Sequence, residues 1–233
     1  MRHAILTAAL LLSTANGAYA LTEVNPPAGW SGVRAYVARE QGTNKIWAGF
    51  QSGLSGIGSC GGWVQIGTST GGLWDEYFVN GTSARDEFWI PNTTTSTSIC
   101  GKNLVVPNFS GDPINIYTWS GDDVVVARGI HPELTVDMGY GYDLALFGSA
   151  NNAFGGSDND TIIATNSAVL RAYGESGNDL FCNYGQNWLE MDGGDGNDQR
   201  FGNAWSTTNL ESVAPSSSAC DSSKSAAIAY VGD

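Results

Sequence analysis

The sequence predicts an all-β protein whose C-terminal part, residues 113–213, coils as a parallel β-roll or β-helix. Three observations predict this fold. Helical periodicity is nearly absent, short apolar runs alternate with Gly, Thr, Ser and Asn, and a Gly/Asp-rich unit recurs along the second half of the chain. Short apolar runs between turn residues are typical of strands, and a repeat with a fixed period is typical of a solenoid.

Residues 1–20 have the pattern of a secretory signal peptide. Arg2 precedes the apolar run 4–12, and Ala18 and Ala20 are the small residues expected before a cleavage site. The apolar run is much shorter than the ~20 residues that cross a bilayer. We therefore expect a secreted, extracellular protein whose mature chain begins at Leu21.

The acidic charge limits the partners that this protein can have. Removal of Arg2 with the leader leaves 9 Lys and Arg against 23 Asp and Glu, so the net charge is 9 − 23 = −14. Such a surface repels nucleic acid and anionic membranes, and it attracts cations or a basic partner. We expect no nucleic-acid partner and no membrane span.

Four cysteines follow the leader, and an even number in an exported chain predicts two disulfides. Of the three possible pairings we favour Cys60–Cys100 and Cys182–Cys220, because each pair then lies within one half of the chain. Buried free thiols are the alternative. The chain has no C-x-x-C, and His131 is the only histidine after the leader, so the spacing fits no zinc site.

Residues 21–112 are interpreted as an irregular β region rich in Trp and Gly. The expected strands are Val33–Val37, Lys45–Phe50, Trp63–Ile66, Trp74–Val79, Glu87–Ile90 and Leu104–Val106. Five tryptophans lie in this region: Trp30, Trp47, Trp63, Trp74 and Trp89. We interpret them as core residues, because large aromatics in strands usually fill the core. A platform for binding sugar is the alternative.

Residues 113–213 contain five similar units, each with an apolar strand and a Gly/Asp loop, and the first four continue with a second apolar strand and a loop rich in Gly and Asn. The aspartates that close the Gly/Asp loops are 20, 17, 19 and 19 residues apart: Asp123, Asp143, Asp160, Asp179 and Asp198. The second strands are expected at Val124–Val126, Leu144–Phe147, Thr161–Ile163 and Leu180–Phe181. One unit cannot bury its apolar side chains alone, so the units are expected to stack about 4.7–4.9 Å apart. Residues 214–233 are left as a C-terminal cap or tail.

The best-preserved loops, 193–198 and 174–179, resemble the Ca²⁺-binding repeat of the RTX, or haemolysin-type, family, with its pattern G-G-x-G-x-D-x-U-x. The copies in this chain are degenerate, and the resemblance covers about 100 residues. It implies a bacterial protein that binds Ca²⁺ along one edge of the roll, since the motif recurs once per turn. The implied ligands are Asp123, Asp143, Asp160, Asp179 and Asp198, with Asp158 and Asp195 as further carboxylates.

The chemistry of calcium agrees with this implication. Ca²⁺ takes six to eight oxygens from carboxylates and carbonyls, and Gly-rich loops expose carbonyls. Unit charges ~4.8 Å apart repel by roughly 1 kcal/mol per pair in water and by about 3–4 kcal/mol at an effective dielectric of 20. A column of bare aspartates is therefore expected to need a cation. The alternative is a dry column in which the aspartates only cap turns.

Three classes of function remain open on the sequence. We favour a non-enzymatic calcium-binding protein of a surface layer, matrix or adhesion system, with no catalytic residue assigned. The second class is a polysaccharide lyase or hydrolase on a parallel β-helix, with Arg128, Arg171 or Arg200 as the base, although these occupy different repeat positions. The acidic pairs 75–76 and 86–87 are interpreted as solvated strand ends. The third class is a carbohydrate-binding module that uses the N-terminal tryptophans.

Overall fold

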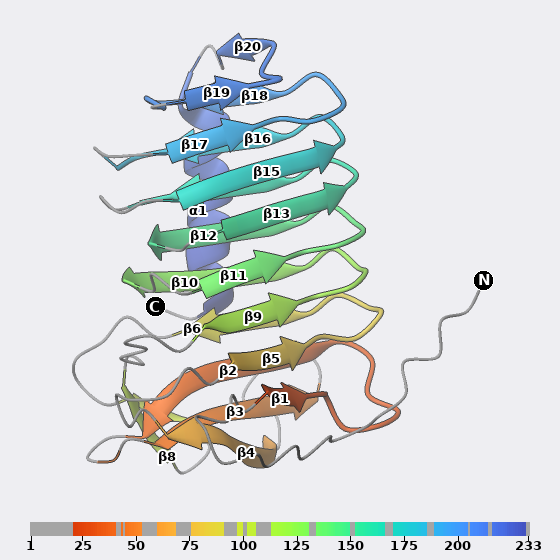
Figure 1. The fold of residues 1–233 in the computed structure, drawn as a ribbon, viewed down its shortest axis with the longest axis vertical. Helices are drawn as coiled ribbons and strands as arrows, with labels where there is room; N and C mark the ends of the chain where they lie inside the picture. Colours follow the sequence, from red (N-terminus) through yellow and green to blue (C-terminus); the bar gives the residue numbers. More distant parts are fainter. Residues whose placement is uncertain are drawn as a thin grey trace, which may run out of the picture.

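The computed structural model shows a coil of two β-sheets that face each other along one axis (Figure 1). It describes residues 21–40, 43, 45–52, 60–68, 76–90, 97–99, 102–105, 113–130, 134–149, 152–165, 170–185, 189–204, 206–213 and 216–231. The prediction of an all-β chain with parallel sheets is confirmed. The proposed leader, 1–20, lies outside the described residues.

The first sheet has eight parallel strands in the order β1-β5-β9-β11-β13-β15-β17-β19. Their bounds are Leu21–Val24, Glu76–Asn80, Ile114–Tyr117, Leu134–Asp137, Asn152–Ser157, Leu170–Ser176, Leu189–Asp192 and Ser206–Thr208. Each successive strand comes from the next turn of the chain, so equivalent residues of the repeat form straight columns across the sheet.

The second sheet follows the order β20-β18-β16-β14-β12-β10-β6-β2-β3-β4, and β7 and β8 are attached beside β2. In that order the path strands are Ser212–Val213, Gln199–Phe201, Leu180–Asn183, Thr161–Ala164, Leu144–Ser149, Val124–Ile130, Glu87–Ile90, Val33–Glu40, Lys45–Ser52 and Cys60–Thr68. The hairpin strands β7 and β8 are Thr97–Ile99 and Lys102–Val105. The pairing is parallel from β20 to β2 and antiparallel between β2, β3 and β4.

Both sheets continue from the N-terminal region into the repeat region. Strand β5 pairs with β9 and strand β6 pairs with β10, each in parallel register. Each of the six strands expected in residues 21–112 has a counterpart, in β2, β3, β4, β5, β6 and β8. Residues 21–112 thus supply the first turns of the coil. Along the chain, the hairpin of β7 and β8 is inserted between β6 and β9.

The core lies between the two sheets and repeats from turn to turn. From the first sheet, Val79, Ile116, Val136, Ala153, Ala172 and Met191 form one completely buried column. From the second sheet, Val125, Ala145, Ile162 and Phe181 point toward it and are also buried. Alternation of inward apolar residues with outward residues fixes the register, because a slip by one residue would turn the whole apolar set outward.

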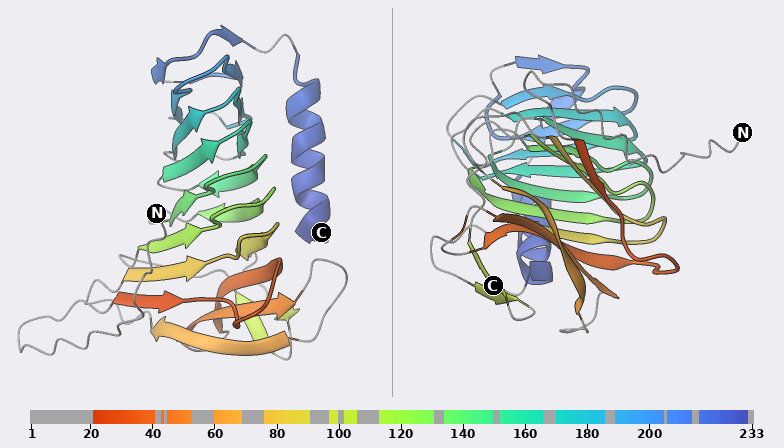
Figure 2. Two further views of the ribbon diagram at one scale, coloured as in Figure 1. Left: turned by 90° about the vertical axis from the view of Figure 1, so that its right-hand side faces the viewer. Right: turned by 60° about the horizontal axis from the view of Figure 1, so that its bottom comes forward.

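The described residues contain one α-helix, α1, which spans Ser218–Val231 and lies along the outside of the second sheet (Figure 2). The sequence interpretation of 214–233 as a cap or tail did not foresee this helix. Its residues Cys220, Ala227 and Ile228 pack on the outward apolar side chains of the sheet: Val124, Val126, Leu146 and Ile163. Strands β10, β12, β14 and β16 of the second sheet are therefore covered on both faces, whereas no helix of the described residues packs on the outward face of the first sheet.

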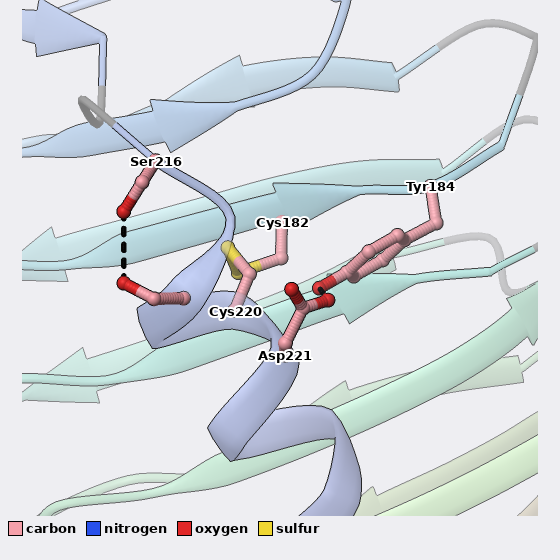
Figure 3. Close-up of a disulfide and its surroundings, with 6 residues drawn as sticks. Cys182, Tyr184, Ser216, Cys220 and Asp221 are labelled. Atoms are coloured by element: carbon pink, nitrogen blue, oxygen red, sulfur yellow. Dashed lines mark hydrogen bonds between the residues drawn. A yellow bond between two sulfur atoms is a disulfide. The ribbon is translucent and has the colours of Figure 1, made fainter.

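A disulfide joins Cys182 of β16 to Cys220 of α1, as predicted (Figure 3). The Cα atoms are 5.7 Å apart, and the Tyr184 hydroxyl donates to Oδ1 of Asp221 at 2.6 Å beside the bond. These contacts fix the first half of the helix on the sheet. Cys100 of the other predicted pair lies outside the described residues, and no helix in the described part of the chain could cross a membrane.

Candidate functional site

The Gly/Asp loops that connect the first sheet to the second share one backbone conformation. Four residues before each aspartate, φ is positive in Trp119, Gly139, Gly156, Glu175 and Gly194. Two residues before it, φ is positive in Gly121, Gly141, Asp158, Gly177 and Gly196. Glycine adopts positive φ without steric cost, which explains why glycine recurs at these two positions.

The aspartates that close these loops form a continuous ladder inside the coil. The backbone N–H of each aspartate donates to Oδ1 of the aspartate in the following turn, over 2.6–2.8 Å. We call this set the aspartate ladder: Asp86, Asp123, Asp143, Asp160, Asp179 and Asp198. All six residues are buried, with exposed fractions of 0–3%. The structure therefore brings the five aspartates expected from the repeat into one column.

Both ends of the ladder are closed by residues that the sequence interpretation missed. Asp86 begins the ladder, and its Oδ1 accepts the N–H of Val33 at 2.6 Å. Glu211 ends it, because its Oε2 accepts the N–H of Asp198 at 2.6 Å in place of a further aspartate. The interpretation of residues 86–87 as solvated strand ends is wrong: Asp86 is 0% exposed, and Glu87 is 5% exposed and bonded to Arg34.

In five aspartates of the ladder, the second carboxylate oxygen, Oδ2, is buried and has no hydrogen-bond partner. These five are Asp123, Asp143, Asp160, Asp179 and Asp198. In the last three of these turns the residue five positions earlier is glycine. A Cβ on Gly155, Gly174 or Gly193 would meet Oδ2 of the aspartate in its own turn at 2.1–2.5 Å. It would also meet a backbone carbonyl oxygen of the next turn, that of Gly174, Gly193 or Asn209 respectively, at 2.1–2.9 Å. We call these three places the glycine cradles.

The turns of Asp123 and Asp143 lack a glycine cradle. Thr118 and Met138 occupy the equivalent position, and both are completely buried. The hydroxyl of Thr118 donates to the carbonyl oxygen of Met138 at 2.7 Å. In these two turns, side-chain atoms therefore occupy the position at which an added Cβ would meet Oδ2 in the three later turns.

Burial makes the ionised form of the ladder carboxyls costly. Removal from water raises the pKa of Asp123 to about 7, that of Asp143 to about 8 and that of Asp160 to about 9. Burial also raises the pKa of Asp179, to about 6, and the pKa of Asp198. Neighbouring carboxylates act in the same direction, so the ladder without a counter-ion favours protons on several rungs.

The other two predicted ligands, Asp158 and Asp195, do not join the ladder. Both are exposed on the outer side of their loops. Beside them lies a second, solvent-facing ladder, in which Asn178 N–H donates to Asn159 Oδ1 and Asn197 N–H donates to Asn178 Oδ1. Among the described residues, no three His, Cys, Asp or Glu side chains converge on one point, so backbone oxygens are needed for any cation at this edge.

Among the residues considered for an enzyme or a sugar platform, those that the structure describes lie away from the ladder. Arg171 is on the outer face of the first sheet, 3.2 Å from Glu190, and Arg200 is on β18 of the second sheet. Trp30 and Trp89 are half-buried against the two apolar clusters, and Trp47 donates to Glu40 at 3.1 Å. The side chains of Trp63, Trp74 and Arg128 lie outside the described part of the structure.

Comparison of the chain with protein-family models, with curated proteins and with solved structures gives no match.

Proposed function

We propose that this chain is a secreted, non-enzymatic calcium-binding β-roll that holds Ca²⁺ ions at one edge of its last three turns. One observation carries the proposal. Asp160, Asp179 and Asp198 each direct a buried, unpartnered Oδ2 toward a glycine cradle that also faces a carbonyl oxygen. Two buried acceptors that face one another repel unless a cation or a proton lies between them.

The donor set fits Ca²⁺ better than other metals. The cradles offer carboxylate and carbonyl oxygens and no nitrogen or sulfur, and oxygen donors of this kind suit a hard cation. The residues that would hold the ions are Asp160, Asp179 and Asp198, with the carbonyls of Gly174, Gly193 and Asn209. Bound Ca²⁺ would neutralise the ladder and join each turn to the next. An ion that binds only the folded chain would stabilise it by mass action.

The cradles also set the number of ions. The resemblance to RTX repeats implied a column of five ligands, but Thr118 and Met138 place side chains where a cradle would lie beside Asp123 and Asp143. We therefore propose up to three ions, all at the C-terminal end of the coil. A stack that calcium orders outside the cell suits a component of a surface layer, matrix or adhesion system.

Calorimetric titration with Ca²⁺ of the protein and two matched variants tests this proposal. Asp179→Asn keeps an Oδ1 that accepts the ladder hydrogen bond, and its amide can donate to the carbonyl of Gly193, so the fold is retained while a ligand charge is lost. We expect this variant to bind about one ion fewer. Asp143→Asn makes the same change beside Met138 and should bind as many ions as the parent chain. No heat of binding to the parent chain, or equal losses in both variants, would overturn the proposal.

A further inference from the structure

Three exposed aromatic side chains gather on two neighbouring loops, away from the glycine cradles. Trp119 is 48% exposed, Tyr140 is 67% exposed and Tyr142 is 61% exposed. The loops are stacked directly, because the N–H of Tyr140 donates to the carbonyl of Trp119 at 3.0 Å and Gly121 N–H donates to the carbonyl of Tyr140 at 2.8 Å. The ring of Tyr117 lies 6.2 Å from that of Trp119 and extends the group. We call these four residues the aromatic patch.

The aromatic residues replace small polar residues of the repeat. Tyr140 bridges to Ser120 on one side and to Ser157 on the other, so serine is its equivalent in both neighbouring turns. The position of Tyr142 is taken by asparagine in the three later turns: Asn159, Asn178 and Asn197. The aromatic patch therefore belongs to the two turns in which Thr118 and Met138 replace the cradle glycine.

The backbone of Trp119 is unfavourable for its side chain. Its φ is 71°, at a position where Gly139, Gly156 and Gly194 stand in other turns. Positive φ is uncommon for a bulky residue, and strain of this kind gathers at functional sites. Nearly half of the Trp119 side chain remains in solvent, so burial in the core does not explain its place. A ligand that covers the indole ring would explain it.

The negative charge beside the aromatic patch favours a ligand that carries positive charge. Asp122 is exposed, and its Oδ1 accepts the N–H of Tyr142 at 3.1 Å, while Asp137 is half-buried and pairs with Tyr117 in the sheet. Residues 117–123 and 137–143 contain no Lys or Arg. Carboxylates and aromatic rings both attract ammonium groups, and they repel acidic polymers.

We propose that the aromatic patch binds a polysaccharide that carries amino groups, such as a glucosamine polymer. The apolar C–H faces of its sugars would pack on Trp119 and Tyr140, and its ammonium groups would lie beside Asp122 and Asp137. Solvent-exposed aromatic rings, together with a few polar groups in fixed positions, are the usual means of recognising such a ligand. This site is separate from the glycine cradles and does not depend on calcium.

Calorimetric titration with glucosamine oligomers tests the proposal, with N-acetylglucosamine oligomers and an acidic uronate oligomer as comparisons. Trp119→Gly removes the ring and relieves the positive φ, so the variant should melt no lower than the parent chain. We expect it to bind glucosamine oligomers about tenfold or more weakly. Glu175→Gly is the matched control, because Glu175 has a φ of 72° at the same position of a turn without exposed aromatics. It should bind like the parent chain.

A second variant keeps the test decisive. The double variant Tyr140→Ser with Tyr142→Asn restores the residues found in the other turns, and it should weaken binding about as much as Trp119→Gly does. A separate variant, Asp122→Asn, should reduce the difference in affinity between glucosamine and N-acetylglucosamine oligomers. The proposal is overturned if no glucosamine oligomer binds, if Trp119→Gly binds as tightly as Glu175→Gly, or if the uronate oligomer binds as well as the glucosamine oligomer.

Discussion

The backbone N–H of Asp179 donates to Oδ1 of Asp198 at 2.8 Å, from one turn of the coil to the next. The same bond recurs at each rung from Asp86 to Asp198, and Glu211 closes the series. Each carboxylate therefore has one oxygen that joins two turns and, from Asp123 onward, one buried oxygen without a partner. This division of roles makes the ladder both a structural element and a candidate binding site.

Glu211 should matter because it is the last acceptor of the ladder. Glu211→Ala leaves the N–H of Asp198 without its carboxylate and should lower the free energy of unfolding by about 1–2 kcal/mol. Glu211→Gln keeps an oxygen acceptor and should remain close to the parent chain. Urea unfolding followed by circular dichroism checks both variants. Equal stability of the Ala and Gln variants would show that this bond does not close the ladder.

Stability of the calcium-free protein should fall as pH rises. The folded-state pKa values of Asp143, about 8, and Asp160, about 9, lie above the ordinary value of 3.8. The folded state therefore holds more protons, and this contribution is complete at pH below about 4 and is lost progressively as pH rises from about 4 to about 9. Urea midpoints in EGTA at about pH 5, 7 and 9 measure the effect.

The whole chain is acidic, so a control must separate the ladder from general repulsion. Asp160→Asn removes a buried titrating group and should flatten the decline in stability, whereas Asp122→Asn removes an exposed carboxylate and should leave most of it. Calcium should also reduce the decline, since the ion competes with protons for the same oxygens. If stability falls with pH equally in Asp160→Asn and Asp122→Asn, the ladder is not the cause of the fall.

The helix α1 should depend on its disulfide. The bond between Cys182 and Cys220 closes a loop with a sequence separation of 38, which corresponds to about 4 kcal/mol in the chain-entropy account. Replacement of both cysteines by alanine should lower the urea midpoint and speed amide exchange in 218–231. Unchanged exchange in the helix would mean that its apolar contacts suffice. Peptide mapping without reduction would in addition test the predicted Cys60–Cys100 pair.

The strands and the aspartate column could be predicted from the sequence because each leaves a regular pattern along the chain. Short apolar runs between turn residues identified strands such as β2 and β12, and the spacing of 17–20 residues identified the turns. Asp86 was missed because the hairpin of β7 and β8 lengthens its turn, so that Asp123 follows after 123 − 86 = 37 residues. The available signal was Gly81, five residues before Asp86, the spacing of the glycine cradles.

Other features could not be read from the sequence because they depend on contacts between turns. The division of each carboxylate into a bonded and an unpartnered oxygen requires the stacked backbone. The helix α1 has little periodicity of its own and acquires a place only against the apolar outer face of the second sheet. The importance of Thr118 and Met138 is likewise visible only when their turns are stacked on that of Gly155.

Hydrogen–deuterium exchange with and without calcium tests the central claim most directly, because it locates the effect along the chain. If Ca²⁺ binds the glycine cradles, calcium should slow amide exchange strongly in residues 152–213, where Asp160, Asp179 and Asp198 lie. It should change exchange in β2 and β3, at the far end of the coil, much less. Exchange that is identical in calcium and EGTA throughout residues 152–213 would contradict the account and leave the ladder as a dry structural column.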